Sequence, residues 1–469
     1  MQLLGLTAFE LYVQGCRRAV KPSDYPNSRL KIRGEKGGMG PLVLGRPGYL
    51  DVPESLRYVV IQRAGDLMDD GHKVPVQPDG MACFMDQDGR YVLLRNHELG
   101  DPVFMNKYNY DMGHYKGGVV PSPNVNPSRY GGVSRAVLDP LQLAKDMQER
   151  PFLQSSSVRN SNMVLAGTDV NCAGGVVDGG WVSCEESSSP GHGYAFLTRP
   201  TDTELTAPRP IRSWGRFHRE AVAIDEATGI VYMTEDRKDG CFYRHVPEDS
   251  RKPMGPGRLQ ALCIPDLPHS DPYPKPSKDG KFEKIWEDGQ SWSVRWVDIP
   301  DPHAADLPCR QQAAKIGGTG FNRSEGIAWS PKGVWFLAST GGPLKGGQIF
   351  RLSPGAGESG ADLLTLEMEI VDRTSLSCPD NIVMAPWGDM IMAEDNYDTL
   401  FGASYQFVRG MTPQGEVYDL LRNPNNKVPG HEPGAEFSGP CFSPDGRYFF
   451  INMQYPENVT LAVTGPWAD

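Results

Sequence analysis

Carboxylic acids stand at corresponding places in a pattern that recurs along this 469-residue chain. In each copy, an apolar stretch passes through a turn that contains glycine into a second apolar stretch, and acidic residues precede the first stretch or follow the second. The opening positions hold Glu220, Glu325, Asp380 and Glu436, and the closing positions hold Glu98, Cys184, Glu185, Glu186, Glu235, Asp236, Glu394 and Asp395. Oxygen-rich sites suit hard cations such as Ca²⁺, and a cysteine among the acids favours a softer transition ion as well.

These acids repel one another if the fold brings them together. Two like charges about 4 Å apart cost on the order of 4 kcal/mol at an effective dielectric constant of about 20, so protons, basic partners or cations must compensate them. The basic residues near these positions are fewer than the acids; they are Arg95, Arg216, Arg219, Arg237 and Arg323. A bound metal ion is therefore the expected compensation.

Each of these residues also has a simpler interpretation. A single acid after a strand is commonly a solvated turn residue, and Cys184 alone resembles a small buried apolar side chain. His97 and His218, taken singly, are typical of hydrogen-bonded fillers. The recurrence of acids at the same phase in nearly every copy favours a shared site over these separate explanations.

The pattern itself predicts β-hairpins. Its copies cover residues 81–98, 172–186, 220–236, 325–340, 381–395 and 437–454. Their short turns, such as the one at Asp88 and Gly89, have the composition of hairpin turns. Six such hairpins predict an all-β, six-bladed β-propeller with long inter-blade insertions, each hairpin forming the inner strands of one blade. A hairpin returns the chain to the end where it began, so the opening and closing residues share one face. A tandem of β-sandwiches is the alternative architecture.

The chain is expected to divide into an N-terminal segment and one domain. We expect residues 1–40 to be a tail or the remnant of a leader, and residues 41–469 to form a single β-propeller domain. Residues 247–312 are predicted to be an insertion over one face, because the stretch is rich in proline and lacks the hairpin pattern. Helix is scarce, and residues 141–149 are a short candidate.

Composition excludes several classes of function. The 47 basic and 58 acidic residues give a net charge of -11, which argues against nonspecific nucleic-acid binding. No run of 18 apolar residues is present, so no membrane span is expected. Nine cysteines without a CxxC pair argue against a disulfide framework or a zinc ribbon. Arg17 and Arg18 are not followed by an apolar run, so a complete twin-arginine export signal is not expected.

Several stretches together resemble one family. They are residues 93–98, 181–186, 215–222, 232–243, 325–327, 379–382, 393–395, 436–446 and 451–454. As a set they are similar to the PhoX-type alkaline phosphatases, and the resemblance covers residues 40–469, closest to a shorter branch of the family. It implies a six-bladed propeller that holds two Fe³⁺ ions and several Ca²⁺ ions and hydrolyses phosphate monoesters. It also implies a periplasmic or secreted protein with a small-molecule substrate. We expect this protein to be a monomer.

The resemblance also implies roles for individual residues. In the family, a Cys-Glu-Glu motif supplies a thiolate to iron, and here that motif falls on Cys184. The metal ligands implied are Glu98, Cys184, Glu185, Glu220, Asp236, Glu325, Glu394, Asp395 and Glu436. We expect Arg216, Arg219 and Arg237 to act in catalysis by clamping the phosphate, because guanidinium groups bind phosphate in a bidentate manner. Arg323, His97 and His218 are predicted to bind substrate.

Two other functions are compatible with a propeller of this kind. A lactonase-type hydrolase would use one Ca²⁺ ion and would need only three or four of the acids and no thiolate. A non-catalytic interaction module would carry the acids as a solvated rim and would hold no metal. Metal stoichiometry and iron content distinguish these alternatives from the phosphatase.

Overall fold

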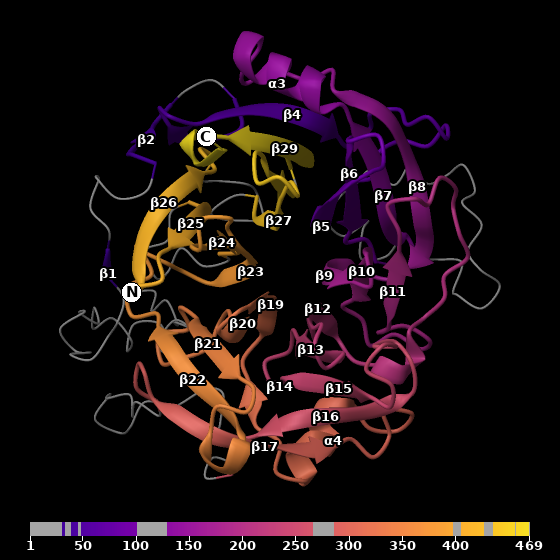
Figure 1. The fold of residues 1–469 in the computed structure, drawn as a ribbon, viewed down its shortest axis with the longest axis vertical. Coiled ribbons are helices and arrows are strands. Elements are labelled where there is room, and N and C mark those ends of the chain that lie inside the picture. Colours follow the sequence, from indigo (N-terminus) through magenta and orange to yellow (C-terminus); the bar gives the residue numbers. More distant parts are fainter. Residues whose placement is uncertain are drawn as a thin grey trace, which may run out of the picture.

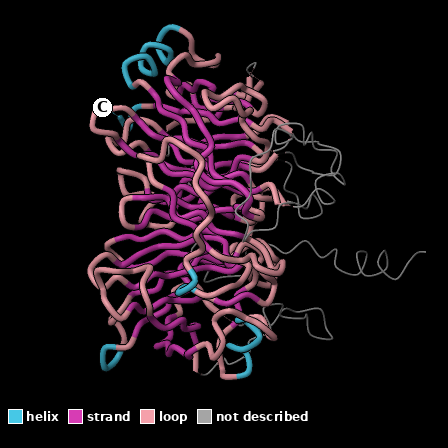
Figure 2. The backbone as a smooth tube through the Cα atoms, turned by 90° about the vertical axis from the view of Figure 1, so that its right-hand side faces the viewer, coloured by secondary structure: helices cyan, strands magenta, loops and turns pink. Residues whose placement is uncertain are grey.

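The structure, a computed structural model, describes residues 31–32, 39–45, 48–100, 129–265, 286–396, 405–425, 435–454 and 456–468. Most of the predicted N-terminal tail and the middle of the predicted insertion lie outside these residues. Within them, β-sheets are arranged in a ring around a centre (Figure 1). Seen from the side, most strands cross the short dimension of the molecule, and loops lie at both faces (Figure 2).

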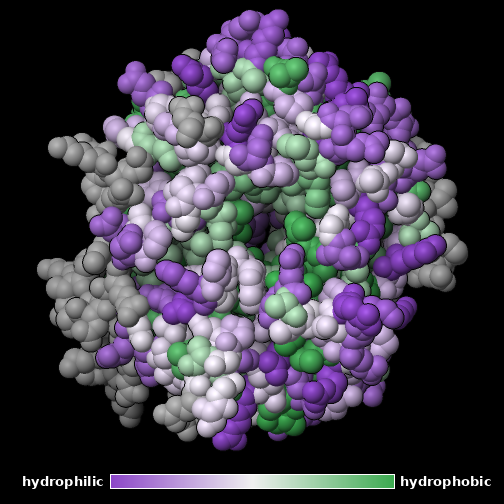
Figure 3. All heavy atoms as spheres, in the orientation of Figure 1, coloured by the Kyte–Doolittle hydropathy of each residue, from purple (hydrophilic) through white to green (hydrophobic). Residues whose placement is uncertain are grey.

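A ring of inner strands surrounds the centre. These strands are β5 (Pro78–Met85), β9 (Asn171–Val177), β12 (Arg219–Asp225), β19 (Ser324–Ser330), β23 (Pro379–Met384) and β27 (Phe437–Phe442). Each contacts the next in this order, and β27 contacts β5, so the ring is closed. One face of the molecule is hollowed at the middle of this ring, with apolar residues around the hollow (Figure 3).

Every inner strand pairs with the strand that follows it in an antiparallel hairpin. The second strands are β6 (Tyr91–His97), β10 (Gly180–Glu185), β13 (Ile230–Glu235), β20 (Gly333–Ala338), β24 (Met390–Glu394) and β28 (Phe449–Met453). The hairpins expected from the repeated pattern are therefore present. Their turns lie at the opposite end of the ring from the residues that open and close them.

Outer strands extend each hairpin. They are β7 (Gly131–Leu138), β8 (Val158–Thr168), β11 (Ala195–Thr198), β15 (Tyr243–Pro247), β16 (Gly257–Cys263), β17 (Ser291–Asp298), β21 (Gln348–Ser353), β22 (Asp362–Glu369), β25 (Phe407–Met411), β26 (Glu416–Arg422), β29 (Val459–Thr464) and β4 (Arg57–Arg63). The short strands are β1 (Lys31–Ile32), β2 (Leu42–Val43), β3 (Val52–Pro53), β14 (Gly240–Cys241) and β18 (Gly320–Phe321).

The all-β, propeller-like arrangement is confirmed, but the blades are not six separate sheets. The strands around two of the hairpins, β12–β13 and β19–β20, belong to a single nine-stranded sheet. The cause is β17, which pairs with β16 on one side and with β22 on the other. Both β16 and β17 lie inside the stretch predicted to be an insertion, where the apolar pattern that marks hairpins is weak.

Strands from the N-terminal and C-terminal parts of the described chain meet in one sheet. Strand β4, from the N-terminal part, pairs with β29, from the C-terminal part. The buried Arg95 side chain of β6 fastens this junction by donating hydrogen bonds to Ser134 on β7, Gln62 on β4 and Thr460 on β29. Closure of the ring therefore includes contacts between residues 365 positions apart.

Helices are few and short among the described residues. Helix α3 (Pro140–Glu149) confirms the predicted helix; Asp139 caps it by accepting hydrogen bonds from the backbone N–H groups of Leu141 and Gln142. Helix α4 (Cys309–Lys315) packs beside β14. No described helix is long and apolar enough to cross a membrane.

Candidate metal centre

The inner strands share an irregularity that aims one side chain each toward a common place. Where β5, β9, β12 and β19 begin, two of their residues lie opposite one residue of the partner strand, and β23 carries a similar shift. The residues at these bulges are Asp79, Cys172, Glu220, Glu325 and Asp380. A bulge redirects a side chain out of the normal alternation of a strand, so these side chains gather at one end of the ring.

Glycines beside the bulges allow the inner strands to come close together. A Cβ atom on Gly80 would lie 2.6 Å from the Cα atom of Ala173, and one on Gly326 would lie 2.3 Å from the carbonyl oxygen of Asp380. No larger residue fits at either position without displacing the neighbouring backbone. The glycines therefore bring the acids of adjacent hairpins within reach of one another.

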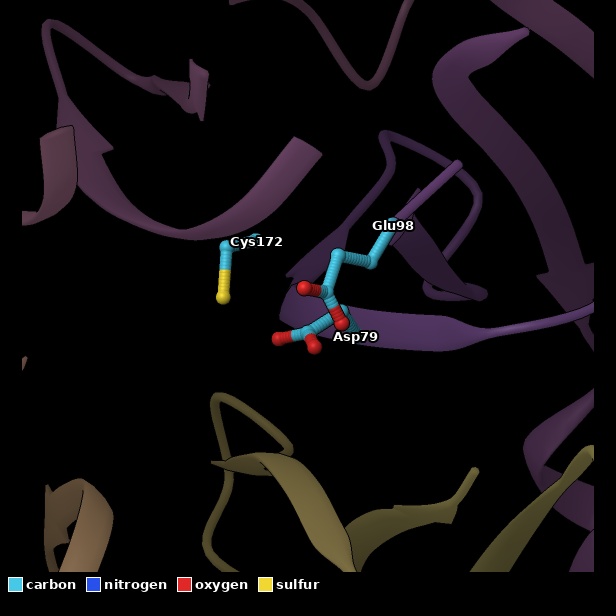
Figure 4. A group of neighbouring side chains, drawn as sticks. All are labelled: Asp79, Glu98 and Cys172. Atoms are coloured by element: carbon cyan, nitrogen blue, oxygen red, sulfur yellow. The ribbon is translucent and has the colours of Figure 1, made fainter. Parts of the chain in front are cut away.

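Seven side chains of the described residues form a continuous cluster. Three overlapping groups have ligand atoms within 4.8 Å of one another: Asp79, Glu98 and Cys172; Cys172, Glu186 and Glu220; Glu220, Glu325 and Asp380. Cys172 and Glu220 each belong to two groups and so join the three. Figure 4 shows the first group, in which both carboxyl groups and the thiol point toward the same space.

Hydrogen bonds between these groups require that some of them carry protons. The Cys172 thiol lies 3.4 Å from Oε1 of Glu220, to which it donates. Glu325 is hydrogen-bonded to Asp380, and Asp395 to Glu436. The second oxygen of Glu220, Oε2, is buried without a hydrogen-bond partner among the described residues, which is the arrangement expected of an atom that serves as a metal ligand.

Burial raises the pKa of the clustered acids. It raises the pKa of Glu98 and of Glu325 to about 7, and charges on neighbouring acids contribute to both shifts. For the other clustered acids burial is again the main cause, and their pKa values lie well above the usual range: Asp79, Glu186, Glu220, Asp380 and Glu436. An acid-rich interior of this kind is neutralised either by protons or by cations.

Arg323 is a cation that lies beside the acids of the cluster. Its Nε and Nη2 atoms donate to the two oxygens of Asp236 at 2.8 and 3.1 Å, and Nη2 also lies 2.9 Å from Oε1 of Glu325. Although burial favours the neutral form of Asp236, the Arg323 guanidinium holds the pKa of that carboxyl below its usual value. The predicted substrate-binding residue Arg323 is therefore placed beside the acids.

His218 and Arg237 lie at the edge of the cluster. Nδ1 of His218 is 3.1 Å from Oε1 of Glu186. Burial, together with the positive charge of Arg237, lowers the pKa of His218 to about 4, so its imidazole is neutral at neutral pH. Arg237 directly follows Asp236 and is exposed to solvent.

Adjacent acids at the ends of the second strands point in opposite directions. Glu186, Asp236 and Asp395 face the cluster, while the residue before each points into its own sheet. Glu185 accepts hydrogen bonds from the backbone N–H groups of Gly193 and Tyr194 at 2.7 and 3.0 Å. The alternation of side chains along a strand explains the difference.

Glu394 likewise points away from the cluster. It accepts hydrogen bonds from Arg409 Nε at 3.0 Å and from the backbone N–H of Ser377 at 2.9 Å. The positions of Glu394 and Glu185 therefore do not support the predicted role of either residue as a metal ligand. Both carboxylates instead hold neighbouring chain segments in place.

The predicted cysteine ligand, Cys184, lies in a hydrophobic cluster instead. It is fully buried there with Trp214 and Tyr243, and burial raises the pKa of its thiol to about 12. The thiol that lies among the acids belongs to Cys172. The difference arises because Cys184 occupies a position of β10 whose side chain faces the interior of the sheet stack.

Three more predicted site residues lie outside the cluster. Arg216 donates hydrogen bonds to backbone carbonyls, including that of His192 at 2.7 Å. Arg219 is completely buried, with its guanidinium 4.0 Å from the ring centroid of Phe217. His97 is buried against Ser134 Oγ at 2.8 Å. These side chains connect segments of the fold, and none of them belongs to the groups of potential ligands.

Asp79 and Cys172 were not expected as ligands from the sequence. Each stands where its inner strand begins, the position that Glu220 and Glu325 occupy in β12 and β19. Counting from this opening position in every hairpin, rather than from the first apolar residue, would have identified both. Glu186 and Asp380 occupy positions recognised in the repeat but not assigned as ligands.

A model of the alkaline phosphatase PhoX family matches residues 37–457. The chain belongs to the PhoX family. It is therefore a metal-dependent phosphatase that acts on phosphate esters. A comparison with curated proteins finds no match.

Solved structures resemble the chain in fold. The structure of PhoX from Pseudomonas fluorescens in complex with vanadate, a transition state analogue, is 16% identical with a TM-score of 0.63 and covers 94% of this chain and 99% of its own. The gluconolactonase XC5397 from Xanthomonas campestris is 12% identical with a TM-score of 0.37, covering 90% of this chain and 99% of its own. A protein of unknown function from Dyadobacter fermentans is 10% identical with a TM-score of 0.41, covering 88% and 99%. The last two similarities are too weak to bear on function.

Proposed function

We propose that this PhoX-family phosphatase hydrolyses phosphate monoesters at a mixed cluster of Fe³⁺ and Ca²⁺ ions. The observation that carries the proposal is the position of Cys172. Its thiol belongs to two of the three groups of potential ligands, and within each group the ligand atoms lie within 4.8 Å of one another. Calcium prefers oxygen ligands, whereas a thiolate selects a transition ion such as iron. The donor set therefore fits a cluster that contains both kinds of ion.

The residues that would hold the ions are those of the overlapping groups: Asp79, Glu98, Cys172, Glu186, Glu220, Glu325 and Asp380. Asp395 and Glu436 form the next pair around the ring and extend the set. When bound, the ions would neutralise the negative charge of the phosphate and polarise its P–O bonds. Metal binding would also remove the protons that these groups share in its absence.

The chain's own cation supports binding of the substrate. Arg323 presents a planar guanidinium beside the acids, a shape that matches two phosphate oxygens. Its present partners, Asp236 and Glu325, hold it in position. Neutral His218, fixed by Glu186, offers a hydrogen bond at the edge without adding charge.

Finer features of the protein are also part of the proposal. Counting the nine-stranded sheet as two units gives a propeller of six blades. The substrate is a small-molecule phosphate ester, and the protein functions as a monomer in the periplasm or outside the cell. No observation favours the lactonase-type hydrolase or the interaction module over the phosphatase.

Metal removal and reloading test the proposed function. The protein is treated with a chelator and assayed on p-nitrophenyl phosphate, then reloaded with Ca²⁺ alone or with Ca²⁺ and Fe³⁺. We expect activity only after both metals return, and loss of at least a hundredfold in Glu220→Gln because a shared ligand is removed. Glu226→Gln, on an exposed turn, is the matched control and should retain full activity. Full activity with Ca²⁺ alone would contradict the mixed cluster.

A further inference from the structure

Arg237 lies at the solvent-exposed edge of the cluster, called its mouth below, where its charge acts on His218. It directly follows Asp236, which faces the acids, and its carbonyl oxygen accepts a hydrogen bond from the backbone N–H of Arg323 at 2.9 Å. Its own N–H donates to the carbonyl of Glu235 at 2.9 Å. The backbone of Arg237 is therefore fixed next to Arg323, the residue proposed to bind phosphate, while its side chain is exposed.

The other guanidinium groups at this mouth are neutralised by acids. Arg323 is bound to Asp236 and Glu325, and Arg310 lies 3.3 Å from Oε1 of Glu235 and 2.8 Å from Oδ1 of Asp239. Within the described ranges, no hydrogen bond or ion pair engages the Arg237 side chain. Its positive charge is nevertheless close enough to His218 to disfavour protonation of that imidazole.

An uncompensated guanidinium beside a phosphate site attracts a second negative group on the same substrate. A phosphate ester consists of the phosphate and an alcohol part, and the alcohol part of a bound ester must extend out of the buried cluster toward the mouth. We propose that Arg237 is a specificity residue that binds an anionic substituent on this alcohol part. The enzyme then prefers phosphate monoesters that carry a second charge, such as a carboxylate, over uncharged ones. This inference rests on the proposed phosphatase function.

Two esters of the same carbon skeleton provide the test. Glycerol 3-phosphate and 3-phosphoglycerate differ in that the second carries a carboxylate in place of a hydroxymethyl group. With the metal-loaded protein, Arg237→Gln should raise KM for 3-phosphoglycerate about fivefold, the size of one exposed ion pair. KM for glycerol 3-phosphate should change less than KM for 3-phosphoglycerate, so the ratio of the two KM values is the readout, and high salt should reduce the difference between the two KM values in the wild type.

Lys238→Gln is the matched control, because it removes the same charge from the adjacent exposed residue. An unchanged KM ratio in this control, together with the loss of preference in Arg237→Gln, supports the inference. An equal loss in both variants would show a general field effect and overturn it, as would an unchanged ratio in Arg237→Gln. Failure of the wild type to hydrolyse either ester would overturn the proposed function itself, together with this inference.

Discussion

The metal-free protein should lose stability as the pH rises toward neutrality. Burial and neighbouring charges raise the pKa of Glu98 and Glu325 from 4.5 to about 7 in the folded state. Below pH 4.5 both acids are protonated whether the chain is folded or unfolded. Between pH 4.5 and 7 the unfolded chain releases these protons and the folded chain keeps them, so the free energy of unfolding falls as the pH rises.

The expected loss is large. For each acid, the pKa in the folded state lies about 2.5 above that in the unfolded state, which corresponds to a loss of about 3 kcal/mol in the free energy of unfolding. The other clustered acids have pKa values shifted in the same direction. Because a typical domain has only about 5–15 kcal/mol of stability, metal-free protein should be close to unfolding at pH 7.5.

Urea denaturation at several pH values between 4.5 and 8 measures this loss directly. Chelator-treated protein should show a falling midpoint across this range, and metal-loaded protein a rising one, because ligands must lose protons to bind metal. Glu325→Gln keeps a neutral side chain at all pH values and should weaken the fall by about 3 kcal/mol. A midpoint of the metal-free protein that stays constant or rises between pH 5 and 7 would refute the reasoning.

Three further predictions concern single residues. Gly326→Ala should lower the free energy of unfolding by about 1–3 kcal/mol and reduce metal content, because the new Cβ atom would lie 2.3 Å from the carbonyl oxygen of Asp380. Gly320→Ala is the control and should do neither, because its Cβ atom would lie 3.8 Å from the nearest atom, the carbonyl oxygen of Gly240. Arg95→Met should cost about 3 kcal/mol in urea denaturation by leaving its buried partners unpaired, whereas Arg90→Met at an exposed site should cost less than about 0.5 kcal/mol; equal costs would contradict the role of Arg95 in ring closure. His245, whose pKa burial lowers to about 4, contributes stability that is lost as the pH falls from 6.5 to 4. In acid titrations monitored by circular dichroism, His245→Gln should therefore be less destabilised by acid over this range than the wild type in the same metal state, and equal curves would contradict the assignment.

Much of this arrangement follows from local sequence. Alternating apolar residues and turn glycines predict the hairpins, and the return of each hairpin to its starting end predicts that Glu220, Glu325 and Asp236 come together. These predictions succeed because they depend only on the geometry of adjacent strands. The position of the short helix, predicted at residues 141–149, follows in the same way.

What the sequence does not reveal is how each strand end is rotated. Whether Glu185 or Glu186 faces the centre depends on the phase of the side-chain alternation at the end of β10, which no single residue type announces. The bulge in β9 places Cys172 among the acids, while Cys184 on β10 lies in an apolar cluster. The nine-stranded sheet depends on β17, which pairs with the preceding strand β16 and also with β22, a strand much further along the chain.

The metal content of two cysteine variants tests the central claim most directly. Purified, untreated wild-type protein should contain iron and several calcium ions per chain and show a visible thiolate-to-iron absorption band. Cys172→Ser should lose the iron and the band, while Cys184→Ser should keep both despite a lower melting temperature. Iron and band retained in Cys172→Ser, or lost in Cys184→Ser, would contradict the assignment of the thiolate to the cluster described here.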